Sequence, residues 1–160
     1  VAKASETFAR LGYQDKIEIA CQDFLTYQPD RPIDKILLDA PCSGLGVLRK
    51  HPEAKWQKSE KMIDKIAMLQ KSLLSHAVEI LRLDGEIIYS VCSFENEETS
   101  DQLFWLKQEY QDKIEIISPV SRLPDYYKRY VTRDQLLMIY AGNKDEMDGF
   151  GAFIIKKRAP

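Results

Sequence analysis

The stretch 35–44 sharply limits the folds open to this chain. It reads Lys-Ile-Leu-Leu-Asp-Ala-Pro-Cys-Ser-Gly, an apolar run that changes abruptly to a carboxylate, a proline, a thiol and small residues. A short buried strand that leads into the active-site loop of an α/β sheet has this pattern. Because ligands of open α/β sheets bind beyond the carboxyl ends of the strands, we expect Asp39 and Cys42 to lie in a functional site.

A second predicted strand, 86–91, ends in a similar way. It runs Glu-Ile-Ile-Tyr-Ser-Val and leads directly into Cys92 and Ser93. Two thiols that follow two strands of one sheet can meet in a single crevice, although they lie fifty residues apart in the sequence. A thiolate at such a position is a potential nucleophile. Cys21 we interpret instead as a small buried hydrophobic residue.

The composition is that of one soluble globular domain, residues 1–160. Its 44% hydrophobic and 30% charged residues are enough for a core. The net charge of −2 does not indicate a nucleic-acid partner, so a local basic patch would have to bind one. No apolar run approaches the ~20 residues of a membrane helix, and the first residues do not form a signal peptide. Three cysteines without C-x-x-C spacing favour neither disulfides nor zinc, so we expect a cytoplasmic protein without a metal.

The predicted elements alternate between strands and helices and end in a hairpin. We predict helices over 3–11, 59–83 and 95–110, and strands over 16–20, 35–38, 86–91, 114–118, 136–140 and 150–155. This order predicts an α/β three-layer sandwich. The acidic run 95–98 suits the dipole of the helix that it opens.

The helix over 59–83 is predicted to be amphipathic. Met68 is expected to fill space in the core, together with Met62, and His76 is expected to be a structural histidine. Five residues at helical spacing are expected to pack on the sheet: Ile66, Leu69, Leu73, Ala77 and Ile80.

Polar residues outside the cysteine loops give weaker signals. Asp23 follows the predicted strand 16–20, where it could bind a polar cofactor group or cap a loop, and the sequence favours neither. Arg49, Lys50 and Lys55 leave the presumed site loop, and they fit a phosphate-binding patch or an ordinary solvated surface.

The two cysteine motifs resemble those of a known enzyme family. Residues 39–52, D-A-P-C-S-G-L-G-V-L-R-K-H-P, are similar to motif IV of the Sun/Fmu family of RNA cytosine-C5 methyltransferases. Residues 89–93, Y-S-V-C-S, followed by the glutamates at 97–98, resemble its motif VI. Residues 148–153 resemble the closing D-G-F-F strand, and 49–56 are similar to the bacterial 16S ribosomal RNA methyltransferase B type.

The resemblance implies a Rossmann-like fold that binds S-adenosyl-L-methionine, and a covalent mechanism. Cys92 would add to C6 of the target cytosine, whereas Cys42 would assist proton removal from C5 and release of the enzyme. Asp39 would hydrogen-bond the N3 and amino edge of the ring. Asp23, Asp39 and Pro41 would contact the cofactor. Because both thiols follow strand ends, the target base must leave its stack.

The expected function is methyl transfer to C5 of a cytosine in RNA, with 16S ribosomal RNA as the first candidate substrate. The implied RNA contacts are Arg49, Lys50 and Lys55. The family's glycine-rich cofactor loop has no counterpart in this sequence, so we expect a C-terminal portion of a catalytic domain that lacks its first strands and is monomeric in the full-length enzyme. The alternatives are the same chemistry on transfer RNA and a non-catalytic remnant that binds RNA or a partner.

Overall fold

A mixed β-sheet forms the centre of the molecule in the computed structural model, which describes residues 2–56, 58–142 and 147–159. The strand order is β1-β2-β5-β3, and β4 pairs with another part of β5. Strands β1 and β2 are parallel, whereas β5 runs antiparallel to all its neighbours. The helices and strands are α1 (Ala2–Arg10), β1 (Ile33–Asp39), α2 (Glu60–Ile80), β2 (Leu81–Val91), α3 (Ser100–Tyr110), β3 (Ile114–Ile117), α4 (Asp125–Lys128), β4 (Leu137–Ile139) and β5 (Phe150–Lys157).

The register between β1 and β2 brings their carboxyl ends together. Leu38 pairs with Tyr89 and Asp39 pairs with Ser90, so the loops that follow the two strands leave the sheet at the same edge. The predicted strands over 35–38 and 86–91 are therefore confirmed as neighbours. The predicted hairpin of β4 and β5 is confirmed as well.

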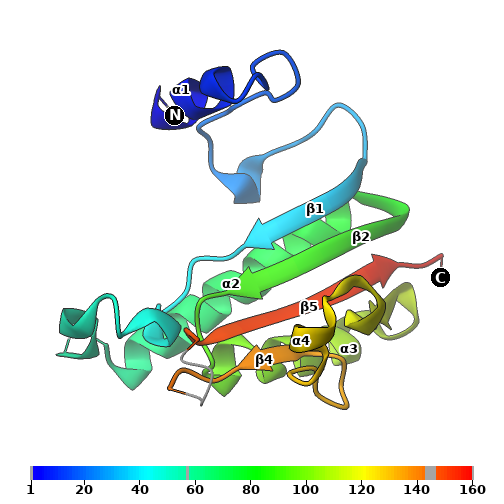
Figure 1. Cartoon of the computed structure of the whole chain (residues 1–160). Helices are drawn as coiled ribbons and strands as arrows, with labels where there is room; N and C mark the ends of the chain where they lie inside the picture. The colour runs from blue at the N-terminus through cyan, green and yellow to red at the C-terminus, as the bar shows by residue number, and fades with distance from the viewer. Residues whose placement is uncertain (1, 57, 143–146, 160) are drawn as a thin grey trace.

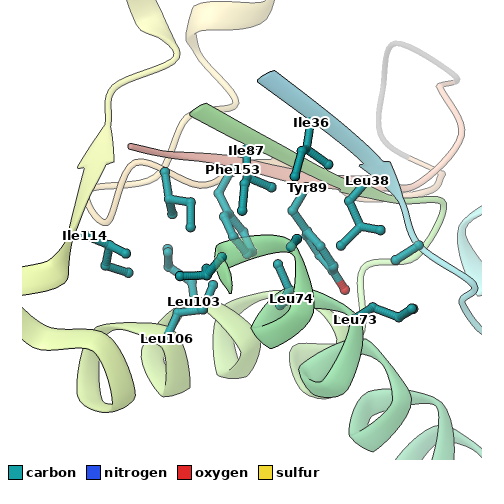
Figure 2. Close-up of a cluster of buried hydrophobic side chains, with 14 of the residues drawn as sticks. Ile36, Leu38, Leu73, Leu74, Ile87, Tyr89, Leu103, Leu106, Ile114 and Phe153 are labelled. Atoms are coloured by element: carbon teal, nitrogen blue, oxygen red, sulfur yellow. The ribbon is translucent and has the colours of Figure 1, made fainter. Parts of the chain in front are cut away.

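Helices α2 and α3 cover one face of the sheet, and the hydrophobic core fills the space between (Figure 1, Figure 2). At its centre the rings of Tyr89 and Phe153 stack with their centroids 4.7 Å apart. Leu74 and Ala77 of α2 and Leu106 of α3 are fully buried against them. This arrangement confirms the expected α/β fold.

The opposite face of the sheet is covered only in part, by the segment around α4 (Figure 1). Arg122 lies in that segment and donates two hydrogen bonds to Glu86 of β2, at 2.8 and 2.7 Å. Leu37 and Ile88 remain exposed on the same face. The expected sandwich has a helical layer on each face of the sheet. The layer of α2 and α3 covers its face more fully than the segment around α4 covers the other.

Two details of α2 differ from the sequence prediction. The helix ends at Ile80 rather than at residue 83, because Leu81 is already extended and begins β2. The expected core residues Met68 and Leu69 are exposed by 69% and 40%. The buried stripe of α2 passes through Gln70 instead. Because each residue of a helix is rotated by about 100° from the one before it, Leu69 points away from the face on which Gln70 lies.

The N-terminal region contains the clearest errors of the prediction. Residues 16–20 alternate in polarity, but they form no strand in the structure, and the backbone N–H groups of Lys16 and Ile17 donate to Tyr13. β1 is an edge strand of the sheet, but residues 16–20 do not pair with it, and an alternating segment that pairs with no other strand is not stable as a strand. Cys21, predicted to be buried, is exposed for the same reason. The predicted helix near the N-terminus is present as α1.

His76 is a structural histidine, as predicted. It is buried, its Nε2 lies 2.8 Å from the carbonyl oxygen of Tyr27, and its ring contacts Phe24 edge-on. These contacts attach the segment that precedes β1 to α2. No helix in the described part of the chain is both long and apolar enough to cross a membrane.

Candidate active site

Cys42 and Cys92 meet at the carboxyl ends of β1 and β2. Their sulfur atoms lie 3.1 Å apart, and both side chains are half-buried. Cys42 follows Asp39 by three residues and Cys92 follows Ser90 by two, so the paired strand ends bring both thiols to one point. The predicted convergence of the two cysteines is therefore confirmed. Their chemical roles remain predictions.

The surroundings of Cys42 favour its protonated form. Burial, followed by the hydrogen bond and the charge of the neighbouring Cys92 sulfur, raises the pKa of Cys42 to about 12. Cys42 is therefore protonated at neutral pH and can donate its S–H to Cys92 Sγ. A thiol that is held protonated cannot act as the first nucleophile, because the thiolate is the reactive form.

Asp39 lies at the end of β1 with an exposed side chain. Its Oδ1 accepts a hydrogen bond of 3.2 Å from the hydroxyl of Ser90. Both residues line a cleft of about 540 Å³ whose other walls are mostly apolar and include Leu37, Ile88 and Phe150. A carboxylate at the rim of an apolar cleft can orient a polar ring edge or a cofactor group.

A buried polar network lies beneath the two cysteines, and the sequence analysis did not predict it. Glu98 and Gln70 are both 0% exposed. The carboxyl group of Glu98 accepts hydrogen bonds from the backbone N–H and the hydroxyl of Ser43, at 2.7 and 2.5 Å. Gln70 Nε2 donates to Glu98 at 3.2 Å and to the carbonyl oxygen of Pro41 at 2.8 Å.

The sequence did contain a signal for this network. Gln70 lies within the apolar stripe of α2, between Ala67 and Leu74, where a polar residue needs a buried partner. The acidic run 95–98 was interpreted as the first turn of a helix, but α3 begins only at Ser100, and residues Asn96–Glu98 form a separate 3₁₀ turn in which Glu97 is exposed and Glu98 is buried. One residue of the run thus belongs to the site.

Of the predicted cofactor contacts, Asp23 shows the loop-capping geometry that the sequence also allowed. Its Oδ1 accepts a hydrogen bond of 3.0 Å from the N–H of Leu25 and caps a short 3₁₀ turn, Phe24–Thr26. Pro41 is exposed at the beginning of the loop that carries Cys42. A role of Asp23 and Pro41 in cofactor binding stays a prediction.

The predicted RNA contacts are exposed side chains. Lys50 Nζ lies 2.6 Å and Arg49 Nη2 lies 3.8 Å from the carboxylate of Asp148, whose pKa the hydrogen bond from Lys50 lowers. Lys55 is placed over the ring of Trp56, with its Nζ 5.4 Å from the centroid. The first two cations are thus paired within the protein, and their predicted contact with RNA must compete with Asp148.

Metal ligation has no candidate in the described ranges of the chain. No group of three or more histidine, cysteine, aspartate or glutamate side chains is arranged there to hold an ion. The reactive side chains at this end of the sheet include the two thiols and the carboxylate of Asp39.

The chain is similar to curated methyltransferases. A family model described as 16S rRNA methyltransferase RsmB/F matches residues 1–155. Ribosomal RNA small subunit methyltransferase F of Escherichia coli O1:K1 / APEC is 39% identical over 107 residues, which make up 67% of this chain and 22% of the relative. The chain thus spans about a fifth of the length of this curated relative.

Solved structures share the fold. NSun6 from Pyrococcus horikoshii with SFG has a TM-score of 0.78 at 23% identity, over 99% of this chain and 39% of that one. A methyltransferase homolog protein from Pyrococcus horikoshii has a TM-score of 0.71 at 22% identity, over 98% of this chain and 50% of that one. Since the family model spans nearly the whole chain, the resemblance seen in the two cysteine motifs is confirmed at family level: this chain belongs to the 16S rRNA methyltransferase RsmB/F family.

Proposed function

We propose that the protein carrying this chain methylates C5 of a cytosine in RNA through a covalent adduct between Cys92 and C6 of the base. One observation carries the proposal: two thiols lie 3.1 Å apart at the ends of two parallel strands, and the surroundings of one keep it protonated. Residues 1–160 would then form one part of a catalytic domain. Family membership supports the same reaction class.

Cys92 is the nucleophile in this proposal. Its sulfur forms a bond to C6, and the electron pair of the C5=C6 bond becomes available at C5. S-adenosyl-L-methionine, when bound, supplies the methyl group. Removal of the proton from C5 then restores the C5=C6 bond and expels Cys92 as a thiolate.

Cys42 accepts the proton from C5. While the Cys92 sulfur is free, its hydrogen bond and charge help to hold the pKa of Cys42 near 12. Once Cys92 is bonded to C6, these two causes are removed, and burial, the largest cause, still raises the pKa of Cys42. In this scheme the Cys42 thiol releases its own proton to solvent, and the resulting thiolate takes the proton from C5.

Asp39 orients the target base. Its carboxylate faces the cleft and is fixed by Ser90, so it can contact the N3 and amino edge of a cytosine that has left its stack. Asp39, Pro41 and Asp23 are the residues that would hold the cofactor. A carboxylate beside an apolar cleft of about 540 Å³ fits the mixed polar and apolar character of such a ligand.

We propose 16S ribosomal RNA in the cytoplasm as the substrate. The curated relative that supports this choice is a small subunit methyltransferase F. We therefore favour the F type over the B type that the stretch 49–56 resembles. Methylation of small-subunit RNA but not of transfer RNA by the purified protein is the expected result, and the reverse preference would contradict it.

A denaturing gel tests the mechanism. The Cys42→Ala variant, incubated with substrate RNA and S-adenosyl-L-methionine, should accumulate a protein–RNA species, because release has lost its base. Cys92→Ala and the double variant should form none. Cys21→Ala is the matched control, since Cys21 is exposed and lies outside the site. An adduct in Cys92→Ala would overturn the assignment of the nucleophile.

Calorimetric titration of this chain with S-adenosylhomocysteine tests the alternative of a non-catalytic remnant. Micromolar binding supports an enzyme, because the residues near Asp39 then hold a cofactor product without help from a partner. A titration without heat of binding would favour the remnant for the isolated chain. Loss of the heat in Asp39→Ala but not in Asp34→Ala would assign the binding to the end of β1.

A further inference from the structure

The serines that follow the two cysteines form a second contact below them. Ser43 Oγ lies 3.3 Å from Ser93 Oγ, and both side chains are buried. The sulfur pair and the hydroxyl pair therefore run in parallel between the same two loops. The spacing of the loops at one level restrains their spacing at the other.

Glu98 anchors this second contact. It accepts both the hydroxyl and the backbone N–H of Ser43, while the hydroxyl of Ser93 can donate to Ser43 Oγ. The chain Ser93–Ser43–Glu98 thus extends from the loop that carries Cys92, through the loop that carries Cys42, to the turn Asn96–Glu98. Gln70 of α2 adds a bond to the same carboxyl group and another to Pro41.

Two side-chain hydroxyls hold the backbone around Glu98 in place. Tyr89 of β2, whose ring is fully buried, donates its hydroxyl to the carbonyl oxygen of Glu98 at 2.9 Å. Thr99, the next residue, donates its hydroxyl to the carbonyl oxygen of Glu95 at 2.6 Å. A buried carboxyl group is costly unless its hydrogen bonds are made, and here each oxygen has at least one donor.

We propose that Glu98 is the positioning residue of the site, which sets the distance between the Cys42 and Cys92 sulfurs by holding Ser43 and, through it, Ser93. The proposal extends the proposed function, because that distance matters for catalysis only if both thiols act. Glu98 is not a catalytic residue in this scheme, since Ser43 lies between it and the thiols. Its loss should slow release of the product rather than weaken binding of RNA.

The rate of disulfide formation between the two thiols measures their proximity without RNA or cofactor. Diamide, a diazene oxidant, accepts two electrons and two protons from the thiols and becomes a hydrazine while the S–S bond forms. All proteins carry Cys21→Ser, so that the exposed third thiol does not react. Intact-mass spectrometry detects the disulfide, because its formation lowers the mass of the protein by two hydrogen atoms.

Glu98→Gln keeps the shape of the side chain but removes one of the two acceptor oxygens. We expect disulfide formation to slow by about tenfold, the scale of one lost hydrogen bond to a buried group. Glu97→Gln is the matched control, because Glu97 is the exposed neighbour in the same turn, and it should react at the parent rate. Equal rates in the two variants, with unchanged melting temperatures, would overturn the proposal.

Ser43→Ala supplies a second test that leaves Glu98 in place, and it decides the question if Glu98→Gln does not fold. It should slow the disulfide to a similar extent, and the double variant should be no slower than the slower single variant, because both act on one chain of contacts. Additive losses would contradict the proposed chain. Disulfide formation in Ser43→Ala at the same rate as in the parent protein would also contradict the proposed chain of contacts.

Turnover separates this proposal from the proposed function. If the parent protein methylates RNA, Glu98→Gln should lower kcat about tenfold with KM for RNA unchanged, and the Cys92 adduct should accumulate. Normal kcat in that variant would contradict the positioning role alone. If the parent transfers no methyl group, the proposed function fails, whereas the disulfide rates still test the role of Glu98.

Discussion

Gly46 and Gly149, more than a hundred residues apart, touch through their backbones. The N–H of Gly149 donates to the carbonyl oxygen of Gly46 at 2.7 Å, and the N–H of Gly46 donates to the carbonyl oxygen of Cys92 at 3.0 Å. A Cβ atom on Gly46 would lie 2.1 Å from Gly149 O. The two cysteine loops and the start of β5 thus meet at a point that admits no side chain.

Gly46→Ala should therefore destabilise the protein and disturb the site. We expect a loss of about 1–3 kcal/mol in the free energy of unfolding, the usual cost of forcing an extra group into a packed region, measured by urea denaturation. Gly142→Ala is the control. A Cβ there meets nothing within 4 Å, so the control has only the strain of its positive φ. Equal stability of Gly46→Ala and the parent would show that the loops separate easily.

Asp39→Asn should reduce turnover without unfolding the protein. The side chain is exposed at the end of β1, so its charge is not needed for the core, but a charge that supports the reacting ring is worth about 10²-fold or more in kcat. Asp34→Asn, an exposed change on the same strand, should leave kcat unchanged. Single-turnover methylation of RNA by the two variants makes the comparison. Normal turnover in Asp39→Asn would show that Asp39 has no role in the reaction and only accepts the hydrogen bond from Ser90.

Acid should weaken the contact between β2 and the segment around α4. The hydrogen bonds from Arg122 lower the pKa of Glu86 from its ordinary 4.5 to about 2, with Lys35 contributing. Since the folded-state pKa is the lower one, the stabilisation is complete above about pH 4.5 and is lost as the pH falls toward 2. Urea midpoints of the parent and Glu86→Gln should therefore converge over that range. A constant difference between them would contradict the assignment.

Removal of Asp148 should strengthen RNA binding. Arg49 and Lys50 are paired with its carboxylate, so Asp148→Asn leaves both cations free to contact phosphates. Lys50→Ala should weaken binding and reduce its dependence on salt concentration, whereas Lys65→Ala on α2 should change neither. Filter binding at several salt concentrations measures both effects. Unchanged affinity in Asp148→Asn and Lys50→Ala would place the RNA elsewhere.

The parts of the site that follow strand geometry were predictable from the sequence. Because the carboxyl ends of parallel strands lie at one edge of a sheet, the pattern around Cys42 and Cys92 was sufficient to predict that the two thiols lie close together. Glu98 was missed because its burial depends on the packing of α2 beneath the loops, and the local sign of that packing was the polar Gln70 within the apolar stripe of α2. The ion pairs of Lys50 with Asp148 join residues about a hundred positions apart, and they were missed for the same reason. Residues 16–20 show the converse, since they have the local pattern of a strand but no partner.

The alignment of Asp39 with Ser90 has a consequence for how the gene can change. Each thiol is carried by a loop of fixed length beyond this pair, and one added or deleted codon shifts the chain by roughly 3.3 Å per residue. That shift is as large as the 3.1 Å between the sulfurs. Point mutations can therefore alter side chains around the site one at a time, whereas any change in the length of either loop separates the thiols in a single step.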